Sequence, residues 1–273
     1  MSVQSAAPKG AITLSKLKKM KQNKQKITSL TAYDASFAAV IDEAGVDFVL
    51  VGDSLGMVVQ GLNTTLPVTM DEMIYHSKIV SRGLSRALLM VDMPFMSYAT
   101  PEQALTNAAR LMKEGGAKII KLEWGALEVE MVRRLSECGI PVCAHLGLTP
   151  QTVHKLGGYR VQGRDNPTAE KMRRDAKILE EAGADMILLE CVPELLAKEI
   201  TELVQVPVIG IGAGADVDGQ ILVLYDIMGI SKGKRPLFSK DYMMGAESIL
   251  AAIQMYDKQV RAGTFPAAEH TFS

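Results

Sequence analysis

Residues 181–192, EAGADMILLECV, contain the junction that decides the fold. Gly183 stands where a helix should end, because glycine adopts the left-handed conformation of a helix C-terminus without steric cost. The run that follows, residues 186–192, is rich in Ile and Leu and has the length of a buried strand. The segment therefore predicts a helix that passes, within a few residues, into a strand of a parallel sheet.

The same junction recurs along the chain. Helix stops at Glu43-Ala44-Gly45, Glu114-Gly115-Gly116 and Glu137-Cys138-Gly139 each lead into an apolar run. Capping boxes are predicted at Thr69-x-x-Glu72 and at Thr100-Pro101-x-Gln103, where helices should begin. The strand candidates are residues 27–33, 48–52, 87–93, 117–123, 141–147, 186–192 and 206–214. This alternation favours an α/β fold of the (β/α)8 TIM barrel type over a doubly wound sheet.

The alternation shows no linker, low-complexity stretch or break in composition, so residues 1–273 are expected to form one barrel domain. A short helical segment is expected before it, at about 13–24. Residues 218–230 are read either as the eighth strand or as a helix, and both readings stay open. Residues 147–165 are expected to form a long loop after the fifth strand, of the kind that can act as a lid.

Composition excludes several classes of partner. The chain has 30 basic and 31 acidic residues and a formal net charge of −1, so no global field attracts nucleic acid or an anionic membrane. No signal peptide and no apolar run of roughly 20 residues is present, which predicts a cytoplasmic protein.

Cys138, Cys143 and Cys191 lack any zinc-ligand spacing and are expected to be small buried hydrophobes. A small molecule is the expected partner.

Polar side chains stand at the ends of five successive predicted strands. They are Asp53 and Ser54, Asp92, Lys121 and Glu123, His145, and Glu190. Each alone has an ordinary structural interpretation, since an Asp after a strand often forms a turn and a His beside leucines often belongs to the core. Closing the barrel, however, would bring four carboxylates to one rim, within about 10 Å of one another. One lysine does not balance that charge, so the pattern predicts a bound cation.

The donors favour a hard ion. Mg²⁺ accepts one or two protein carboxylates and keeps other positions for water and substrate, so Asp53 and Asp92 are the expected ligands, with Glu123 acting through water. Zinc is disfavoured because His145 is the only strand-end imidazole, and His145 is assigned to the substrate instead. His76, His154 and His270 are expected to have surface or local structural roles.

A glycine-rich stretch follows the seventh predicted strand. Residues 210–215, GIGAGA, imitate a dinucleotide-binding fingerprint but lack the helix and acidic partner in the usual register. Close approach of a ligand or another backbone, or simple turn chemistry, are the two favoured interpretations of these glycines.

The strand-end blocks resemble those of the ketopantoate hydroxymethyltransferase family from about residue 13 onward. The blocks are LTAYD at 30–34, VGDSLG at 51–56, KLE at 121–123, AHLGLTPQ at 144–151, LECVP at 189–193 and GIGAG at 210–214. The resemblance implies a barrel of the phosphoenolpyruvate/pyruvate type and a cytoplasmic homodecamer of stacked pentamers. It also implies the substrates 3-methyl-2-oxobutanoate and 5,10-methylenetetrahydrofolate.

The resemblance also implies roles for the strand-end residues. Asp53 and Asp92 would bind one Mg²⁺ per subunit, with Glu123 close to the ion, and through that ion they would contact the keto acid. Ser54, Lys121 and His145 would bind the keto acid directly, and Glu190 would be the general base. Two other readings are weighed against this one: a metal-dependent carbon–carbon lyase of the pyruvate group, which needs no folate, and a non-catalytic barrel that serves as an assembly subunit.

Overall fold

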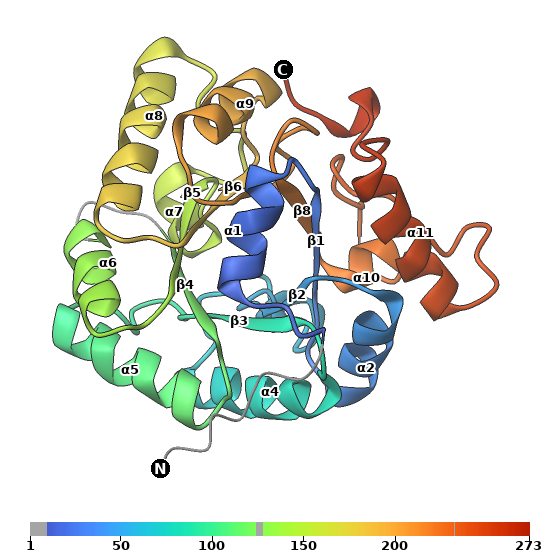
Figure 1. Cartoon of the computed structure of the whole chain (residues 1–273), viewed down its shortest axis with the longest axis horizontal. Coiled ribbons are helices and arrows are strands. Elements are labelled where there is room, and N and C mark those ends of the chain that lie inside the picture. Colours follow the sequence, from blue (N-terminus) through green and yellow to red (C-terminus); the bar gives the residue numbers. More distant parts are fainter. Residues whose placement is uncertain (1–9, 124–127, 232) are drawn as a thin grey trace.

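The computed structural model describes residues 10–123, 128–231 and 233–273, and its centre is a closed barrel of parallel strands (Figure 1). Each strand pairs with its neighbour in sequence, and β1 pairs with β8 to close the ring. The strands are β1 (Ile27–Thr31), β2 (Phe48–Val51), β3 (Leu88–Asp92), β4 (Ile119–Glu123), β5 (Val142–Gly147), β6 (Met186–Glu190), β7 (Val208–Ile211) and β8 (Gly219–Leu222). The barrel prediction is confirmed, and the doubly wound sheet is excluded.

Helices surround the strands, as Figure 1 shows. They are α1 (Leu14–Gln22), α2 (Ala35–Ala44), α3 (Leu55–Val58), α4 (Met70–Gly83), α5 (Pro101–Lys113), α6 (Glu128–Glu137), α7 (Val153–Leu156), α8 (Asn166–Glu181), α9 (Glu194–Leu203), α10 (Leu224–Ile227) and α11 (Ile249–Arg261), with 3-10 turns η1 (Pro150–Thr152) and η2 (Ala268–His270). Within the described ranges, no helix is both long enough and apolar enough to cross a bilayer.

The helix ends follow the predicted local chemistry with one exception. The glycines at 45, 116, 139 and 183 all have positive φ, between 76° and 103°. Thr69 and Glu72 form a complete capping box. At α5 the Thr100 hydroxyl accepts the Gln103 backbone N–H, but the side-chain oxygen Oε1 of Gln103 accepts the Ala99 N–H instead of the Thr100 N–H. The second predicted capping box is therefore wrong, because the Gln103 side chain bonds the backbone N–H of Ala99, one residue before the helix cap.

Residues 218–230 contain both of the structures left open by the sequence. β8 comes first, and the short helix α10 follows it after Val223. Gly219 allows this strand to approach β1, since a Cβ there would lie 2.4 Å from the Ile27 carbonyl oxygen. The Leu224 N–H then donates to the Thr31 hydroxyl at 3.0 Å, which ties the start of α10 to the end of β1.

Helix α1 lies across the amino-terminal end of the barrel (Figure 1). Lys18 Nζ lies 2.8 Å from Asp185, just before β6, and Lys21 Nζ lies 2.7 Å from Asp218, just before β8. These ion pairs fasten the helix over one opening, which leaves the opposite, carboxyl-terminal opening for ligands.

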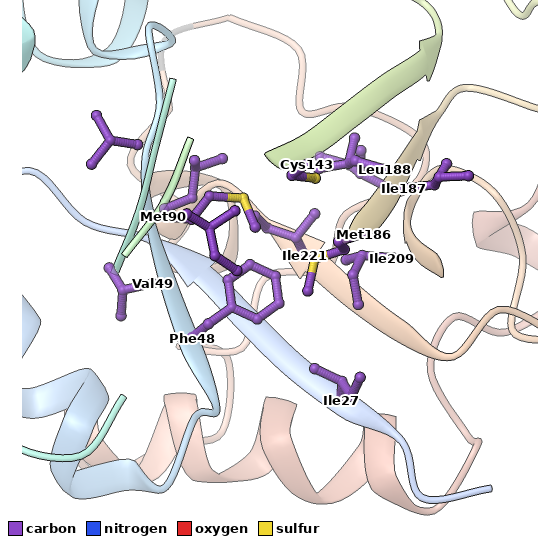
Figure 2. Close-up of a cluster of buried hydrophobic side chains, with 14 of the residues drawn as sticks. Ile27, Phe48, Val49, Met90, Cys143, Met186, Ile187, Leu188, Ile209 and Ile221 are labelled. Carbon is purple, nitrogen blue, oxygen red and sulfur yellow. The ribbon is translucent and has the colours of Figure 1, made fainter. Parts of the chain in front are cut away.

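The amino-terminal half of the barrel interior is filled by apolar side chains. Figure 2 shows Phe48, Met90, Met186 and Ile221, from four different strands, converging there. All four are at most 2% exposed. Cys143 and Cys191 are buried, as predicted, but Cys138 is exposed. The prediction for Cys138 is wrong because the residue follows the end of α6 instead of lying on a strand.

Candidate active site

A cavity of about 1740 Å³ opens at the carboxyl-terminal end of the barrel. Every predicted site residue lines it: Asp53, Ser54, Asp92, Lys121, Glu123, His145 and Glu190. The alternation of side chains along a strand explains this gathering. On β4, Lys121 and Glu123 both point into the barrel, and on β5 His145 follows Cys143 on the same inner face. Strand pairing then sets Asp92 beside Lys121 and Glu123 beside His145.

Asp53 and Asp92 lie next to each other at the barrel mouth. The Asp53 N–H donates to Asp92 Oδ2 at 3.2 Å, and Lys121 Nζ donates to Asp92 Oδ1 at 2.5 Å. Burial, together with the negative charge of Asp92, raises the pKa of Asp53 to about 7 in spite of the nearby ammonium. Both aspartates line the same cavity, and when both are ionised they carry one more charge than Lys121 balances.

Glu123 and Lys121 extend this charge cluster. Burial and the proximity of Asp53 raise the pKa of Glu123 well above its ordinary value. Burial alone would lower the pKa of Lys121, but the charges of Asp92 and Glu123 outweigh it, so the net pKa is raised and the ammonium keeps its proton. When all four groups are ionised, three negative charges stand against one positive charge in a site that is at most 4% exposed.

His145 lies between two carboxylates. Its Nδ1 is 3.7 Å from Glu123 Oε1, and its Nε2 is 3.4 Å from Glu190 Oε2. Neither ring nitrogen makes a hydrogen bond to a described residue, although the side chain is only 1% exposed. Burial, helped by the Lys121 charge, holds the pKa of His145 well below its usual range. The imidazole is therefore neutral and has two buried nitrogens available to a ligand.

Glu190 ends β6, and the backbone around it is tightly packed. Cys191, the next residue, has a φ of +49°, a conformation that non-glycine residues rarely adopt. Gly147 lies so close that a Cβ there would be 2.2 Å from the Glu190 carbonyl oxygen, and the Leu148 N–H donates to that oxygen at 2.8 Å. Burial raises the pKa of Glu190 to about 8. A carboxylate with such a pKa is a strong enough base to accept protons near neutral pH.

Two contacts at the site were missed by the sequence reasoning. Ser54 shares a hydrogen bond of 2.8 Å with the hydroxyl of Tyr33, whose ring stacks on Tyr225. Gln151 contacts both Asp53 and Glu123, each at 2.9 Å. Tyr33 and Gln151 both lie in the blocks at 30–34 and 144–151, but neither residue type titrates near neutral pH, so a search for charged strand ends passed over them.

The remaining histidines lie away from the strand ends, although His270 also lines the cavity. His76 Nδ1 lies 2.7 Å from the Tyr33 carbonyl oxygen, His154 is exposed on α7, and His270 accepts the Ala267 N–H in η2. The predicted loop at 147–165 contains η1 and α7, and its residues Tyr159 to Val161 line the cavity mouth.

The glycines after β7 serve close packing. A Cβ at Gly212 would lie 2.9 Å from the Phe238 ring, and one at Gly214 would lie 2.6 Å from Glu194 Cβ. The stretch leads into β8 and not into a helix, so the helix N-terminus that a dinucleotide pyrophosphate needs does not follow it. Gly212 and Gly214 also have positive φ, of 63° and 76°, so close packing and turn chemistry both account for these glycines.

The residues fit a hard dication bound by few protein ligands. In the described part of the chain, no three His, Cys, Asp or Glu side chains form a preassembled metal cage. Mg²⁺ keeps most of its waters and uses one or two carboxylates, and the adjacent Asp53 and Asp92 with their uncompensated charge meet that requirement.

Solved structures share the fold. The structure of phosphonopyruvate hydrolase in complex with oxalate and Mg²⁺ has a TM-score of 0.62 and 14% identity, covering 92% of this chain and 97% of that one. A 2,3-dimethylmalate lyase of the PEP mutase/isocitrate lyase superfamily has a TM-score of 0.58 and 16% identity, covering 93% and 99%. These likenesses agree with the closed (β/α)8 barrel described above, and at identities this low they show the fold alone.

Curated sequences are far more similar. The 3-methyl-2-oxobutanoate hydroxymethyltransferase of Alkalilimnicola ehrlichii is 59% identical over 261 residues, which cover 96% of this chain and 94% of that protein. The enzyme of the same name from Shewanella loihica is 58% identical over 262 residues, covering 96% and 99%. A family model described as ketopantoate hydroxymethyltransferase matches residues 11–268. On these matches, the chain belongs to the ketopantoate hydroxymethyltransferase family.

Proposed function

We propose that this hydroxymethyltransferase transfers a one-carbon unit from 5,10-methylenetetrahydrofolate to 3-methyl-2-oxobutanoate and so forms 2-dehydropantoate. The observation that carries the proposal is the buried Asp53–Asp92 pair, which lies beside Lys121 and shares one cavity with Glu190. The acidic pair and the base occupy different strands around one space, as a reaction that removes a proton next to a carbonyl group requires.

Glu190 is proposed as the general base. Its carboxylate accepts the proton at C3 of the keto acid, the electrons of the C–H bond move toward the keto oxygen, and C3 becomes nucleophilic. Water is the co-reactant: one methylene carbon–nitrogen bond of the folate opens to an iminium ion, water adds to that carbon, and the second carbon–nitrogen bond breaks to release tetrahydrofolate and leave formaldehyde. C3 then forms its bond to the formaldehyde carbon, and the formaldehyde oxygen takes a proton to become the hydroxyl group of 2-dehydropantoate. The pKa of about 8 favours this role, because it gives the carboxylate a proton affinity that an exposed glutamate lacks.

Lys121, His145 and Ser54 are proposed to orient the keto acid. Lys121 supplies the one fixed positive charge among the strand-end residues, and it suits the substrate carboxylate. Neutral His145, with both nitrogens unbonded, can donate to an oxygen of the substrate beside Glu190. Ser54, held by Tyr33, fixes which face of the substrate is presented to the base.

Asp53 and Asp92 are proposed to hold one Mg²⁺, with Glu123 contributing through water. The ion, when bound, supplies positive charge that stabilises the negative charge developing on the keto oxygen. The ion would also balance the excess of two negative charges among Asp53, Asp92, Glu123 and Lys121. Asp53 and Asp92 would thus act on the keto acid by holding the ion.

The broader setting is also proposed. We infer that residues 1–273 make one barrel domain, which includes a short N-terminal helical segment at about 13–24. We infer that the protein acts in the cytoplasm as a homo-oligomer, a decamer by resemblance to its family, with keto acid and folate as its partners and neither nucleic acid nor membrane among them. The near balance of 30 basic and 31 acidic residues supports the last point.

Deuterium exchange tests the proposal. The keto acid is incubated with the protein in D₂O without folate, and the C3 signal is followed by NMR with Mg²⁺ and with EDTA. Exchange should require Mg²⁺, and 2-dehydropantoate should form only after methylenetetrahydrofolate is added. A carbon–carbon lyase would consume its substrate without folate, and a non-catalytic barrel would give no exchange, so either result would overturn the proposal.

A further inference from the structure

A buried amide in the segment after β5 reaches across the barrel mouth to the acidic cluster. Gln151, which is 4% exposed, donates through Nε2 to Asp53 Oδ2 and to the Met93 carbonyl oxygen, both at 2.9 Å. Its backbone N–H donates to Glu123 Oε2 at 2.9 Å. Both hydrogens of the amide nitrogen are therefore used, and one residue contacts two of the three carboxylates in the cluster.

Tyr98 fixes the orientation of this amide. The Tyr98 hydroxyl donates to Gln151 Oε1 at 2.5 Å, and Tyr98 itself is 9% exposed in the segment between β3 and α5. If the amide rotated by half a turn, its oxygen would face the Asp53 carboxylate and the Met93 carbonyl, and its NH₂ would face the tyrosine. The flipped state loses the two hydrogen bonds to Asp53 and Met93, whose oxygens can only accept, so one orientation is strongly favoured, and in that orientation the Tyr98 hydroxyl holds the amide oxygen.

Gln151 also meets an electrostatic requirement that a charged residue would not. Asp53 and Glu123 need hydrogen-bond donors because they are buried, yet their negative charge must remain for a cation. A lysine or arginine at position 151 would satisfy the carboxylates and also neutralise them. An amide donates without adding charge, so the cluster keeps its excess of negative charge.

We propose that Gln151, oriented by Tyr98, is a positioning residue that aims Asp53 at the cation. By occupying Oδ2 of Asp53, Gln151 leaves Oδ1 for the ion and prevents the carboxylate from rotating. The inference rests on the proposed function, since it assumes that Asp53 is a metal ligand. It adds that the segment after β5 takes part in metal binding without contributing a ligand.

Metal affinity measured on Gln151→Met tests the inference, because methionine keeps the side-chain volume and removes both donors. Binding of Mn²⁺ is followed by electron paramagnetic resonance and binding of Mg²⁺ by calorimetry, with no substrate present. The expected result is a 10- to 100-fold weaker affinity, the range for residues that orient metal ligands. At saturating metal, kcat should recover most of its wild-type value.

Gln220→Met is the matched control. Gln220 is also 4% exposed and also donates through Nε2 to a backbone carbonyl, that of Gly214, but it contacts none of the acidic residues. It should lower Tm about as much as Gln151→Met and leave metal affinity unchanged. Equal affinity in Gln151→Met and wild type would overturn the inference while leaving the metal site intact. A wild-type protein that binds neither ion would overturn the metal assignment and the inference together.

Tyr98→Phe gives a second, milder test, since it removes one hydroxyl and leaves Gln151 in place. The amide then loses one of the three hydrogen bonds that hold its side chain, and metal affinity should fall several-fold, by less than in Gln151→Met. Tyr256→Phe is its control, because Tyr256 is fully buried and its hydroxyl lies 2.9 Å from the Ser29 carbonyl oxygen, on β1. Unchanged affinity in Tyr98→Phe would show that the tyrosine does not orient the amide.

Discussion

The two halves of the barrel interior are equally closed to water and differ in polarity. At the amino-terminal half, Phe48 and Met186 are 0% exposed among other apolar side chains, and at the carboxyl-terminal half, Asp53 and His145 are 3% and 1% exposed among charges. Burial therefore stabilises the first half, through the hydrophobic effect and close packing, and raises the energy of the second. The stable half serves as the support that holds the polar half in an arrangement it would not keep alone.

The largest expected effect is at the polar half. Glu190→Gln removes the proposed base and keeps the size of the side chain, so exchange at C3 of the keto acid should fall by about 10²- to 10⁴-fold. Metal affinity should change little, because Glu190 contacts His145 and none of the proposed ligands. The exposed Glu202→Gln, on α9, is the control and should leave exchange unaltered. Undiminished exchange in Glu190→Gln would remove Glu190 from the base role.

The apolar half should show the opposite pattern. Phe48→Ala empties space in a packed core, so the free energy of unfolding should drop by about 3–5 kcal/mol, as measured by denaturant unfolding. The affinity for Mg²⁺ of the folded fraction should stay near that of the wild type, because Phe48 and the acidic cluster occupy opposite halves of the interior. A large loss of metal affinity in the folded variant would contradict the separation of roles between the halves.

This separation explains what the sequence could and could not predict. Strand ends can be read from local pattern, so Asp53, Asp92, Lys121, Glu123, His145 and Glu190 were found by position alone, and the barrel closed them around one cavity. Gln151 escaped because its importance lies in three contacts with residues at least 28 positions away in sequence. Whether residues 218–230 form a strand could not be read locally either, because β8 forms by pairing with β1, which lies about 190 residues earlier in the sequence.

Asp53→Asn tests whether the negative charge of the polar half, and not the shape of the side chain, is what binds Mg²⁺. The amide has nearly the shape of the carboxylate and lacks its charge, so Mg²⁺ affinity should fall by more than about 100-fold, beyond the range of about 10- to 100-fold for residues that only orient a ligand. Tm in the absence of metal should rise or stay level, because a buried carboxylate with a raised pKa is replaced by a neutral group.

Asp185→Asn is the matched control for Asp53→Asn. Asp185 lies at the other end of the barrel, is ion-paired with Lys18 at 2.8 Å, and accepts the Val142 N–H. Its loss should lower Tm and leave metal affinity as it is. If Asp185→Asn weakened Mg²⁺ binding as much as Asp53→Asn does, the position of the aspartate in the barrel would not matter, and the ligand assignment would fail.

The smallest effect concerns pH. The pKa of Asp53 is raised to about 7 in the folded protein, so between its ordinary value of 3.8 and about 7 the native state holds a proton that the unfolded chain has lost. Without metal, stability from this group is therefore lost as pH rises through that window.

Mg²⁺ must displace the proton, so its affinity should fall by about tenfold from about pH 7.5 to about pH 6. Thermal unfolding with and without Mg²⁺ should show a larger increase in Tm at about pH 8 than at about pH 6, and Asp53→Asn should abolish that difference. An increase in Tm that is independent of pH would mean that the ion binds without displacing a proton, and Asp53 would then not be the group that it meets.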